Sequence, residues 1–158
     1  MDTPRRSASI SASATTNASG AERPAFSKTL DQAAVALANE MMGGAQKVLD
    51  MSVEYAKVRV QFGRPIGSFQ AIKHKCADMM LRVESARSAS WYAGWAAAEG
   101  DPELPALASL AKAYCSDAYF HCAAEAIQIH GGVGFTWEYE IHLYFKRAKS
   151  SEALRGDA

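Results

Sequence analysis

The chain has 158 residues, enough for one domain, and a chain of this length buries roughly two thirds of the surface that it exposes when unfolded. Its 17 basic and 17 acidic residues give a formal net charge of zero, which excludes proteins that hold nucleic acid or an anionic membrane through a net positive field. No apolar run approaches the roughly 20 residues needed to span a bilayer, so we expect a soluble protein.

The first 26 residues are rich in Ser, Ala and Thr and poor in bulky apolar side chains. Such a segment cannot bury enough surface to offset the entropy of ordering it, so we predict a disordered tail over residues 1–26. Arg5, Arg6 and the serines also allow a weak organellar transit peptide. The pattern changes after this tail, which places a single helical domain at residues 27–158.

Helical periodicity dominates the rest of the chain. A first helix is predicted to begin near Leu30, and apolar positions then recur at spacings of four and three as far as Phe62. The segment GRPIGS, residues 63–68, supplies a helix stop and a turn. A second helix follows with the same pattern over about residues 72–97, and the Gly-Asp-Pro cluster at residues 100–102 ends it.

A third helix is predicted to begin near Leu104, with small residues along one face that let a partner helix approach closely. The glycines of HGGVGF, residues 130–135, end it. A last helix runs from about Glu138 to Leu154, and no stretch alternates with a period of two for long enough to be a convincing strand. The sequence therefore predicts an all-α, antiparallel, up-and-down four-helix bundle.

Three clusters of polar and aromatic residues fall where helices are predicted to end or begin: RVQFGRP from Arg59, SFQAIKH from Ser68 and QIHGGVGF from Gln128. The Arg59 guanidinium matches the paired oxygens of a phosphate, although a solvated arginine at a helix end is an equal alternative. Gln70 and Gln128 suit a nucleotide base, a flavin ring or a ribose, and Gln70 could instead cap its helix.

The glycines at positions 131 and 132 allow backbone N–H groups to approach an anion, or they only terminate the third helix. GGVG lacks the preceding strand of a dinucleotide fingerprint, and no GxSxG nucleophile accompanies HGG. The four histidines match no short metal motif, and the three cysteines match no zinc or disulfide pattern, so we expect no metal site. We interpret Cys76, Cys115 and Cys122 as small buried hydrophobic residues in a reducing compartment.

The order and spacing of these clusters resemble the C-terminal domain of acyl-CoA dehydrogenases. The resemblance rests on YAKVRVQFGRPIGSFQAIKHKCADM and AKAYCSDAYFHCAAEAIQIHGGVGFTWEYEIHLYFKRAKS, and it runs from about Leu30 to Asp157. It implies an FAD-dependent oxidoreductase that removes the α and β hydrogens of an acyl-CoA thioester, in fatty acid, branched acyl or sterol side-chain β-oxidation. Electrons would then pass to an electron-transfer flavoprotein.

The resemblance also implies roles for particular residues. The position of Arg59 contacts the FAD pyrophosphate, and those of Phe62, Phe69 and Gln70 line the cofactor. The adenosine side would be held by the segment Gln128, Ile129, His130, Gly131 and Gly132. Because the FAD would be bound mainly by a neighbouring subunit, we expect a dimer or tetramer with itself or with a related subunit.

Two departures limit the expected activity. The family's catalytic glutamate corresponds to Arg155, which cannot act as a general base, and the alternative base position on the first helix corresponds to about Ala33. Glu152 lies three positions away, on a different side of its helix. This pattern resembles the non-basic subunit of heteromeric acyl-CoA dehydrogenases.

The resemblance also covers only the C-terminal domain, so we expect a truncated or split product that is inactive alone. Two alternatives remain at this point: a helical dimerisation module without flavin chemistry, and a relative of the acyl-CoA oxidases. We expect a cytoplasmic protein, or a mitochondrial one in a eukaryote, and the zero net charge argues against nucleic-acid or membrane partners.

Overall fold

The computed structural model describes residues 22–154. Within this range lie α1 (Glu22–Val58), β1 (Val60–Gln61), β2 (Arg64–Pro65), η1 (Ile66–Ser68), α2 (Gln70–Glu99), α3 (Leu104–His130), η2 (Gly131–Phe135) and α4 (Ile141–Ala153). Residues 1–21 of the tail predicted over residues 1–26, and the position of Arg155, lie outside the described residues.

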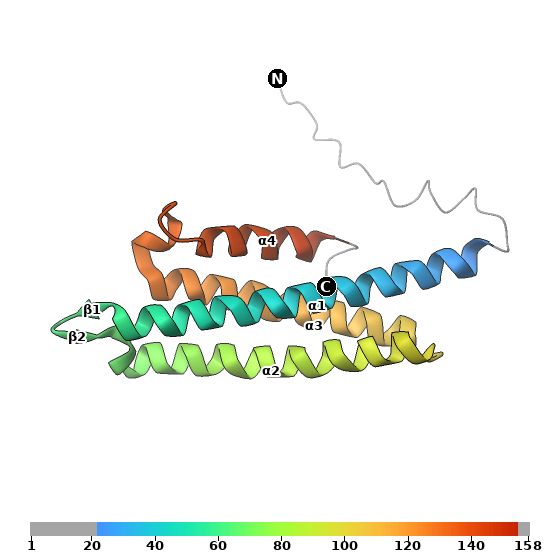
Figure 1. Ribbon diagram of the computed structural model, residues 1–158, viewed down its shortest axis with the longest axis horizontal. Coiled ribbons are helices and arrows are strands. Elements are labelled where there is room, and N and C mark those ends of the chain that lie inside the picture. The colour runs from blue at the N-terminus through green and yellow to red at the C-terminus, as the bar shows by residue number, and fades with distance from the viewer. Residues whose placement is uncertain (1–21, 155–158) are drawn as a thin grey trace, which may run out of the picture.

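The four α-helices alternate in direction, which confirms the predicted all-α, up-and-down four-helix bundle (Figure 1). The helices α1 and α3 lie between α4 on one side and α2 on the other (Figure 1). Because the helix directions alternate along the chain, α1 and α3 run parallel to each other, and they pack together along most of their length. Their C-terminal ends therefore lie at the same end of the bundle.

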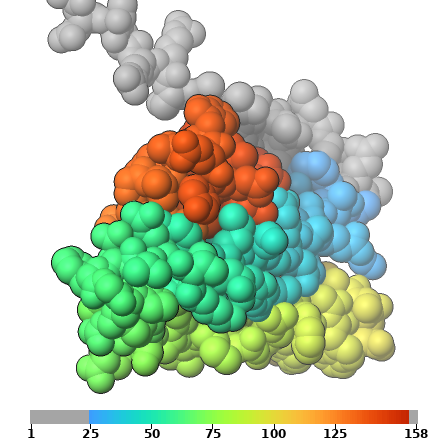
Figure 2. Space-filling model, turned by 60° about the vertical axis from the view of Figure 1, so that its left-hand side comes forward, coloured from blue at the N-terminus to red at the C-terminus, as the bar shows by residue number. Residues whose placement is uncertain are grey.

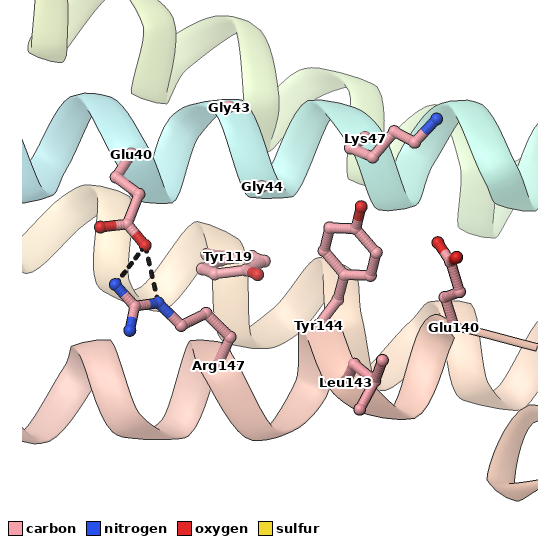
Figure 3. A pocket seen from close by; sticks show the side chains of 9 residues that line it. All are labelled: Glu40, Gly43, Gly44, Lys47, Tyr119, Glu140, Leu143, Tyr144 and Arg147. Carbon is pink, nitrogen blue, oxygen red and sulfur yellow. Dashed lines mark hydrogen bonds and ion pairs between the residues drawn. The ribbon is translucent and has the colours of Figure 1, made fainter. Parts of the chain in front are cut away.

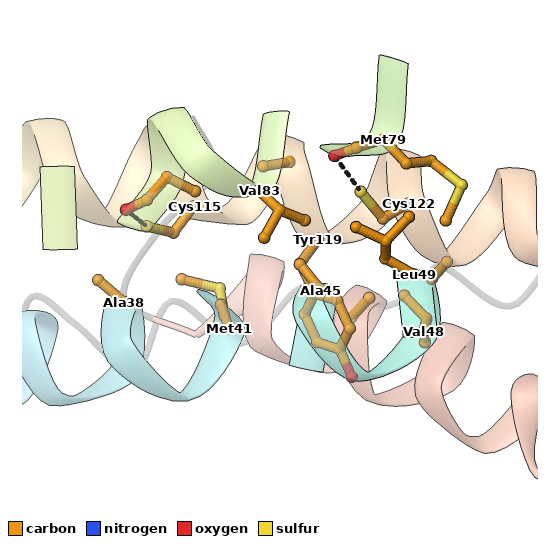
Figure 4. Close-up of a cluster of buried hydrophobic side chains, with 14 of the residues drawn as sticks. Ala38, Met41, Ala45, Val48, Leu49, Met79, Val83, Cys115, Tyr119 and Cys122 are labelled. Atoms are coloured by element: carbon orange, nitrogen blue, oxygen red, sulfur yellow. Dashed lines mark hydrogen bonds between the residues drawn. The ribbon is translucent and has the colours of Figure 1, made fainter. Parts of the chain in front are cut away.

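Small residues and sulfur-containing side chains fill the centre of the bundle (Figure 4). The buried Cys115 and Cys122 thiols of α3 donate to the Ala86 and Met79 carbonyls of α2, with Sγ–O distances of 3.5 and 3.7 Å. Burial raises the pKa of both thiols to about 12, so neither forms a reactive thiolate near neutral pH. These two cysteines are buried as predicted, whereas Cys76 is only half-buried.

Three boundaries differ from the prediction. The helix α1 begins at Glu22, eight residues before Leu30, because Pro24 falls in the first turn, where its missing N–H group has no helical acceptor. Residues 22–26, predicted as tail, are thus helical. The segment around residues 60–65 forms a short antiparallel hairpin, so α1 ends at Val58 and not near Phe62 as predicted. The helix α4 begins at Ile141 rather than near Glu138, because η2 and a turn come first.

Over residues 22–154, none of the helices combines the length and the apolar character that crossing a bilayer requires. The same part of the chain contains no group of three or more His, Cys, Asp or Glu side chains arranged to hold a metal ion.

Candidate functional site

The C-terminal ends of α1 and α3 are joined by stacked aromatic rings. Tyr55 of α1 and His130 of α3 stack with their ring centroids 4.2 Å apart, and Tyr139 packs edge-on against both rings at 5.5 Å. Figure 2 shows this end of the molecule, with the green segment that follows α1 below the orange segment that follows α3. The sequence clusters that begin at Arg59 and Gln128 therefore share one end of the bundle.

The hairpin after α1 has a strained two-residue turn. Phe62 and Gly63 both have positive φ, 54° and 77°, as a type I′ turn requires. This conformation is uncommon for a bulky residue with a Cβ atom. The Phe62 ring is nevertheless 93% exposed and meets Phe69 edge-on, with centroids 6.1 Å apart. The Arg64 guanidinium lies 4.1 Å from the centre of the Phe69 ring, which leaves Phe69 half-buried.

Arg59 and Gln70 lie on either side of this hairpin with exposed side chains. The Arg59 backbone is held at both ends, since its N–H donates to Tyr55 and its carbonyl accepts from Ile66. Within residues 22–154, the Arg59 guanidinium has neither a hydrogen bond nor an ion pair. Gln70 does not cap α2, because Phe69 occupies the cap position and no side chain bonds there. Both polar groups are available to a ligand.

The segment Gln128–Gly132 divides into exposed and buried positions. Gln128, Gly131 and Gly132 are exposed, whereas the Ile129 and His130 side chains are buried in the bundle. His130 Nδ1 donates to the Ala126 carbonyl at 2.7 Å, and burial lowers the pKa of its imidazole, which keeps it neutral at pH 7. Any contact of Ile129 or His130 with a ligand would therefore come from the backbone.

The two glycines leave open space around this segment. Gly131 caps α3 with φ 66°, and a Cβ atom added at Gly131 or Gly132 would meet no atom within 4 Å. A ligand can thus approach the backbone closely here. We use the name polar rim for the exposed groups gathered at this end: Arg59, Gln70, Gln128, Gly131 and Gly132.

The positions considered for a general base hold no free carboxylate. Ala33 is an exposed residue of α1, and the position of Arg155 lies outside the described residues. Glu152 of α4 forms an ion pair with Lys149 at 2.9 Å, so its carboxylate is already engaged. Among the described residues, neither Ala33 nor Glu152 therefore offers an unpaired carboxylate.

Sequence reasoning missed a cavity of about 570 Å³ between α1 and α4 (Figure 3). Glu40 and Arg147 bridge one end of it at 2.5 Å, and the Tyr119 ring lies under Gly44. Burial raises the pKa of the Tyr119 hydroxyl to about 12. The only local signal was the Gly-Gly pair at positions 43 and 44 inside a helix, because Glu40 and Arg147 are 107 residues apart.

The fold is the all-α, up-and-down bundle predicted from the sequence, and the polar rim lies at one end of it. The chain matches the family model described as "Acyl-CoA dehydrogenase, C-terminal domain" over residues 23–158. It is 44% identical over 158 residues to acyl-CoA dehydrogenase IpdE2 of Mycolicibacterium smegmatis, an alignment that covers 99% of this chain and 47% of that protein. The chain therefore belongs to the acyl-CoA dehydrogenase family and corresponds to its C-terminal domain.

Solved structures agree with this assignment. Butyryl-CoA dehydrogenase from Megasphaera elsdenii matches with a TM-score of 0.80 and 37% identity, over 83% of this chain and 34% of that one. The ChsE4–ChsE5 complex from Mycobacterium tuberculosis matches with a TM-score of 0.73 and 34% identity, over 79% of this chain and 33% of that one. The chain thus spans about half of IpdE2 and about a third of the solved dehydrogenases.

Proposed function

We propose that this chain supplies one wall of a shared FAD site in an enzyme that dehydrogenates acyl-CoA thioesters between the α and β carbons. FAD, when bound, supplies the hydride acceptor of that reaction, and an electron-transfer flavoprotein would reoxidise it. The observation that carries the proposal is the polar rim, where the helix packing brings an unpaired guanidinium, two carboxamides and an open glycine turn to the same end of the bundle.

The groups of the polar rim fit the chemistry of FAD. The Arg59 guanidinium is exposed and unpaired among the described residues, and its fork can bind a pyrophosphate in a bidentate manner. Gln70 and Gln128 each offer a donor and an acceptor to ring or ribose groups. The backbone at Gly131 and Gly132 has room for a ligand, since no atom lies where a Cβ would be added.

The side chains and glycines of the polar rim are exposed in this chain, which supports a site shared with another polypeptide. Phe62 is 93% exposed, and an aromatic ring held outward in a strained turn gains little within this chain alone. A solved relative is a complex of two proteins, ChsE4 and ChsE5, which is a precedent for association between different subunits. The proposed partners are therefore acyl-CoA and a second subunit, identical or related.

The chain does not complete the reaction by itself under this proposal. Ala33 cannot accept the α proton, and an arginine at position 155 stays protonated. The general base must then come from the partner polypeptide, while this chain contributes the positioning of the cofactor.

A chimera tests the role of Arg59. Residues 23–158 would replace the matching domain of Megasphaera elsdenii butyryl-CoA dehydrogenase, and bound flavin per chain would be measured by absorbance after gel filtration. We expect the chimera to retain FAD and Arg59→Ala to lower its retention, by roughly tenfold in affinity for one charge-assisted phosphate contact.

The matched control is Arg82→Ala, which removes an exposed arginine from the middle of α2, away from the polar rim. Flavin content should be unchanged in this variant. Equal flavin content in the Arg59→Ala chimera and its parent would contradict the proposal.

A further inference from the structure

A cavity of about 470 Å³ lies between α1 and the start of α2. Its volume is within the range of roughly 300–1,000 Å³ that is typical of small-molecule pockets. Its lining is mostly apolar, with Val53 and Ala56 from α1, Pro65 from β2 and Ile72 from α2. None of the polar-rim residues lines it, so this cavity is separate from the proposed flavin site.

One wall of the cavity is a close contact between η1 and α1. A Cβ atom added at Gly67 would lie 2.9 Å from the Ala56 carbonyl oxygen, so η1 reaches α1 only because residue 67 has no side chain. Ala56 itself is buried. This wall is therefore made of tightly packed backbone and a methyl group, which favours an apolar ligand.

The apolar surface continues along α2. A further cavity of about 490 Å³ shares Val53 and Cys76 with the first and extends to Leu49 and Met80. Along α2 the surface extends from Lys73 to Met80, about 10 Å at the rise of a helix. This length suits an extended, flexible apolar chain. We call the joined surface the α1–α2 groove: Leu49, Val53, Ala56, Ile72, Cys76 and Met80.

The two ends of the α1–α2 groove carry opposite charges. Lys57 and Lys73 line one end, whereas Asp50, Glu54 and Glu84 line the other. Lys57 is already paired with Glu54 at 2.6 Å. The Lys73 side chain is exposed, and within residues 22–154 its ammonium group has neither a hydrogen bond nor an ion pair. An anionic group is therefore attracted to Lys73 and repelled from the far end.

The start of α2 adds positive potential beside Lys73. Phe69 occupies the N-cap position and no side chain bonds to the first turn of this helix. The partial positive charge at the N-terminus of a helix favours a negative group there. The lysine and the helix end therefore act in the same direction.

We propose that the α1–α2 groove binds a free carboxylic acid with an unbranched apolar chain. The carboxylate lies against Lys73, and the chain runs past Cys76 toward Met80. A second site of this kind goes beyond the proposed function, because it uses neither the polar rim nor the bound flavin.

Cys76 provides a direct readout of occupancy. Its thiol is half-buried and lines both cavities, whereas Cys115 and Cys122 are buried in the core with their pKa raised to about 12. N-ethylmaleimide should therefore modify Cys76 first, and intact mass gives the rate. A chain lying in the groove covers this thiol and slows the reaction.

The test compares three ten-carbon probes on the full chain: decanoate, decylamine and decanol. Decanoate should slow the modification of Cys76 in a saturable manner, by about tenfold at ten times its dissociation constant. Decylamine and decanol should protect far less at the same concentration, because neither carries a negative charge. Absence of protection by decanoate, or equal protection by decylamine or decanol, would overturn the proposal.

Two pairs of variants locate the carboxylate and the chain, each compared with its own ligand-free rate. Lys73→Met should raise the dissociation constant of decanoate by about tenfold, as loss of one charge-assisted contact does, whereas Lys28→Met at the opposite end of α1 should not change it. Val53→Trp should abolish protection by filling the groove, whereas Met51→Trp, which does not line it, should leave protection intact.

Far-UV circular dichroism establishes that the tryptophan variants fold. Lys73 is exposed, so its substitution by methionine leaves the packing of the bundle unchanged and tests the proposal even if a tryptophan variant fails to fold. Unchanged affinity for decanoate in Lys73→Met, or full protection in a folded Val53→Trp chain, would contradict binding in this groove.

Discussion

Two neighbouring glycines of α1 have opposite surroundings. A Cβ atom at Gly44 would lie 2.5 Å from Cζ of Tyr119, whereas a Cβ atom at Gly43 would meet nothing within 4 Å. Tyr119 is only 2% exposed, so its ring would have to leave its packed position toward the cavity of Figure 3. We expect Gly44→Ala to lower the free energy of unfolding by about 1–2 kcal/mol, measured by urea denaturation.

Gly43→Ala is the control for that substitution. Alanine loses less conformational entropy than glycine when a helix forms, so Gly43→Ala should raise the free energy of unfolding by about 0.5–1 kcal/mol. A change of the same sign in both variants would mean that the packing of Tyr119 against Gly44 does not decide the effect.

At the scale of elements, the hairpin between α1 and α2 has a strained backbone and an exposed aromatic side chain, both at Phe62. Phe62 occupies the first central position of a type I′ turn, where Asn before Gly is strongly preferred. Phe62→Asn should therefore raise the free energy of unfolding by about 1 kcal/mol. The same substitution should reduce flavin retention in the chimera, because the exposed ring is one of the residues that the resemblance assigns to the cofactor.

Phe135→Asn separates turn strain from the removal of an exposed aromatic ring. Phe135 is 69% exposed, and its φ is not positive, so asparagine relieves nothing there. We expect no gain in stability from this substitution. If Phe135→Asn raised the free energy of unfolding as much as Phe62→Asn, backbone strain at Phe62 would not explain the gain in stability.

The helices were predictable from the sequence because an apolar pattern that repeats over many turns outweighs the helix or strand preference of single residues. The stripe that begins at Leu37 and the small residues of α3 each extend over many turns, and helices formed there, although α1 ends at Val58 and Phe62 lies in the hairpin. The hairpin escaped prediction because two-residue strands are too short to show a period of two. The start of α1 was also predicted too late, since Pro24 reads as a breaker except in a first turn.

The candidate site was predictable only where local motifs carry it. Arg59, Gln70 and Gln128 lie at helix ends in the sequence, and the parallel course of α1 and α3 places those ends together. The burial of Ile129 and His130 depends on packing against Tyr55, which spacing along one helix does not reveal. The cavity beside Glu40 and Arg147 needs two segments 107 residues apart, so only the tertiary structure shows it.

At the scale of the whole molecule, the groups proposed to hold the cofactor lie at one end of the bundle. The helices α1 and α3 end there and α2 begins there, so residues far apart in the sequence share the polar rim (Figure 1). Under the proposed function, this rim forms one wall of a site that another polypeptide completes. The chain is then one part of a larger assembly.

The base position decides whether such an assembly needs a second kind of subunit. The resemblance assigns Arg155 to the position of the family's glutamate, so in the chimera with Megasphaera elsdenii butyryl-CoA dehydrogenase we expect bound flavin without turnover. Arg155→Glu should raise turnover of butyryl-CoA by roughly 10²-fold or more, as a general base does. Ala153→Glu, which adds a carboxylate two residues earlier on another side of the helix, should give no gain. If Arg155→Glu left turnover unchanged while flavin stayed bound, position 155 would not be that of the base, and the dependence on a partner's glutamate would lose its support.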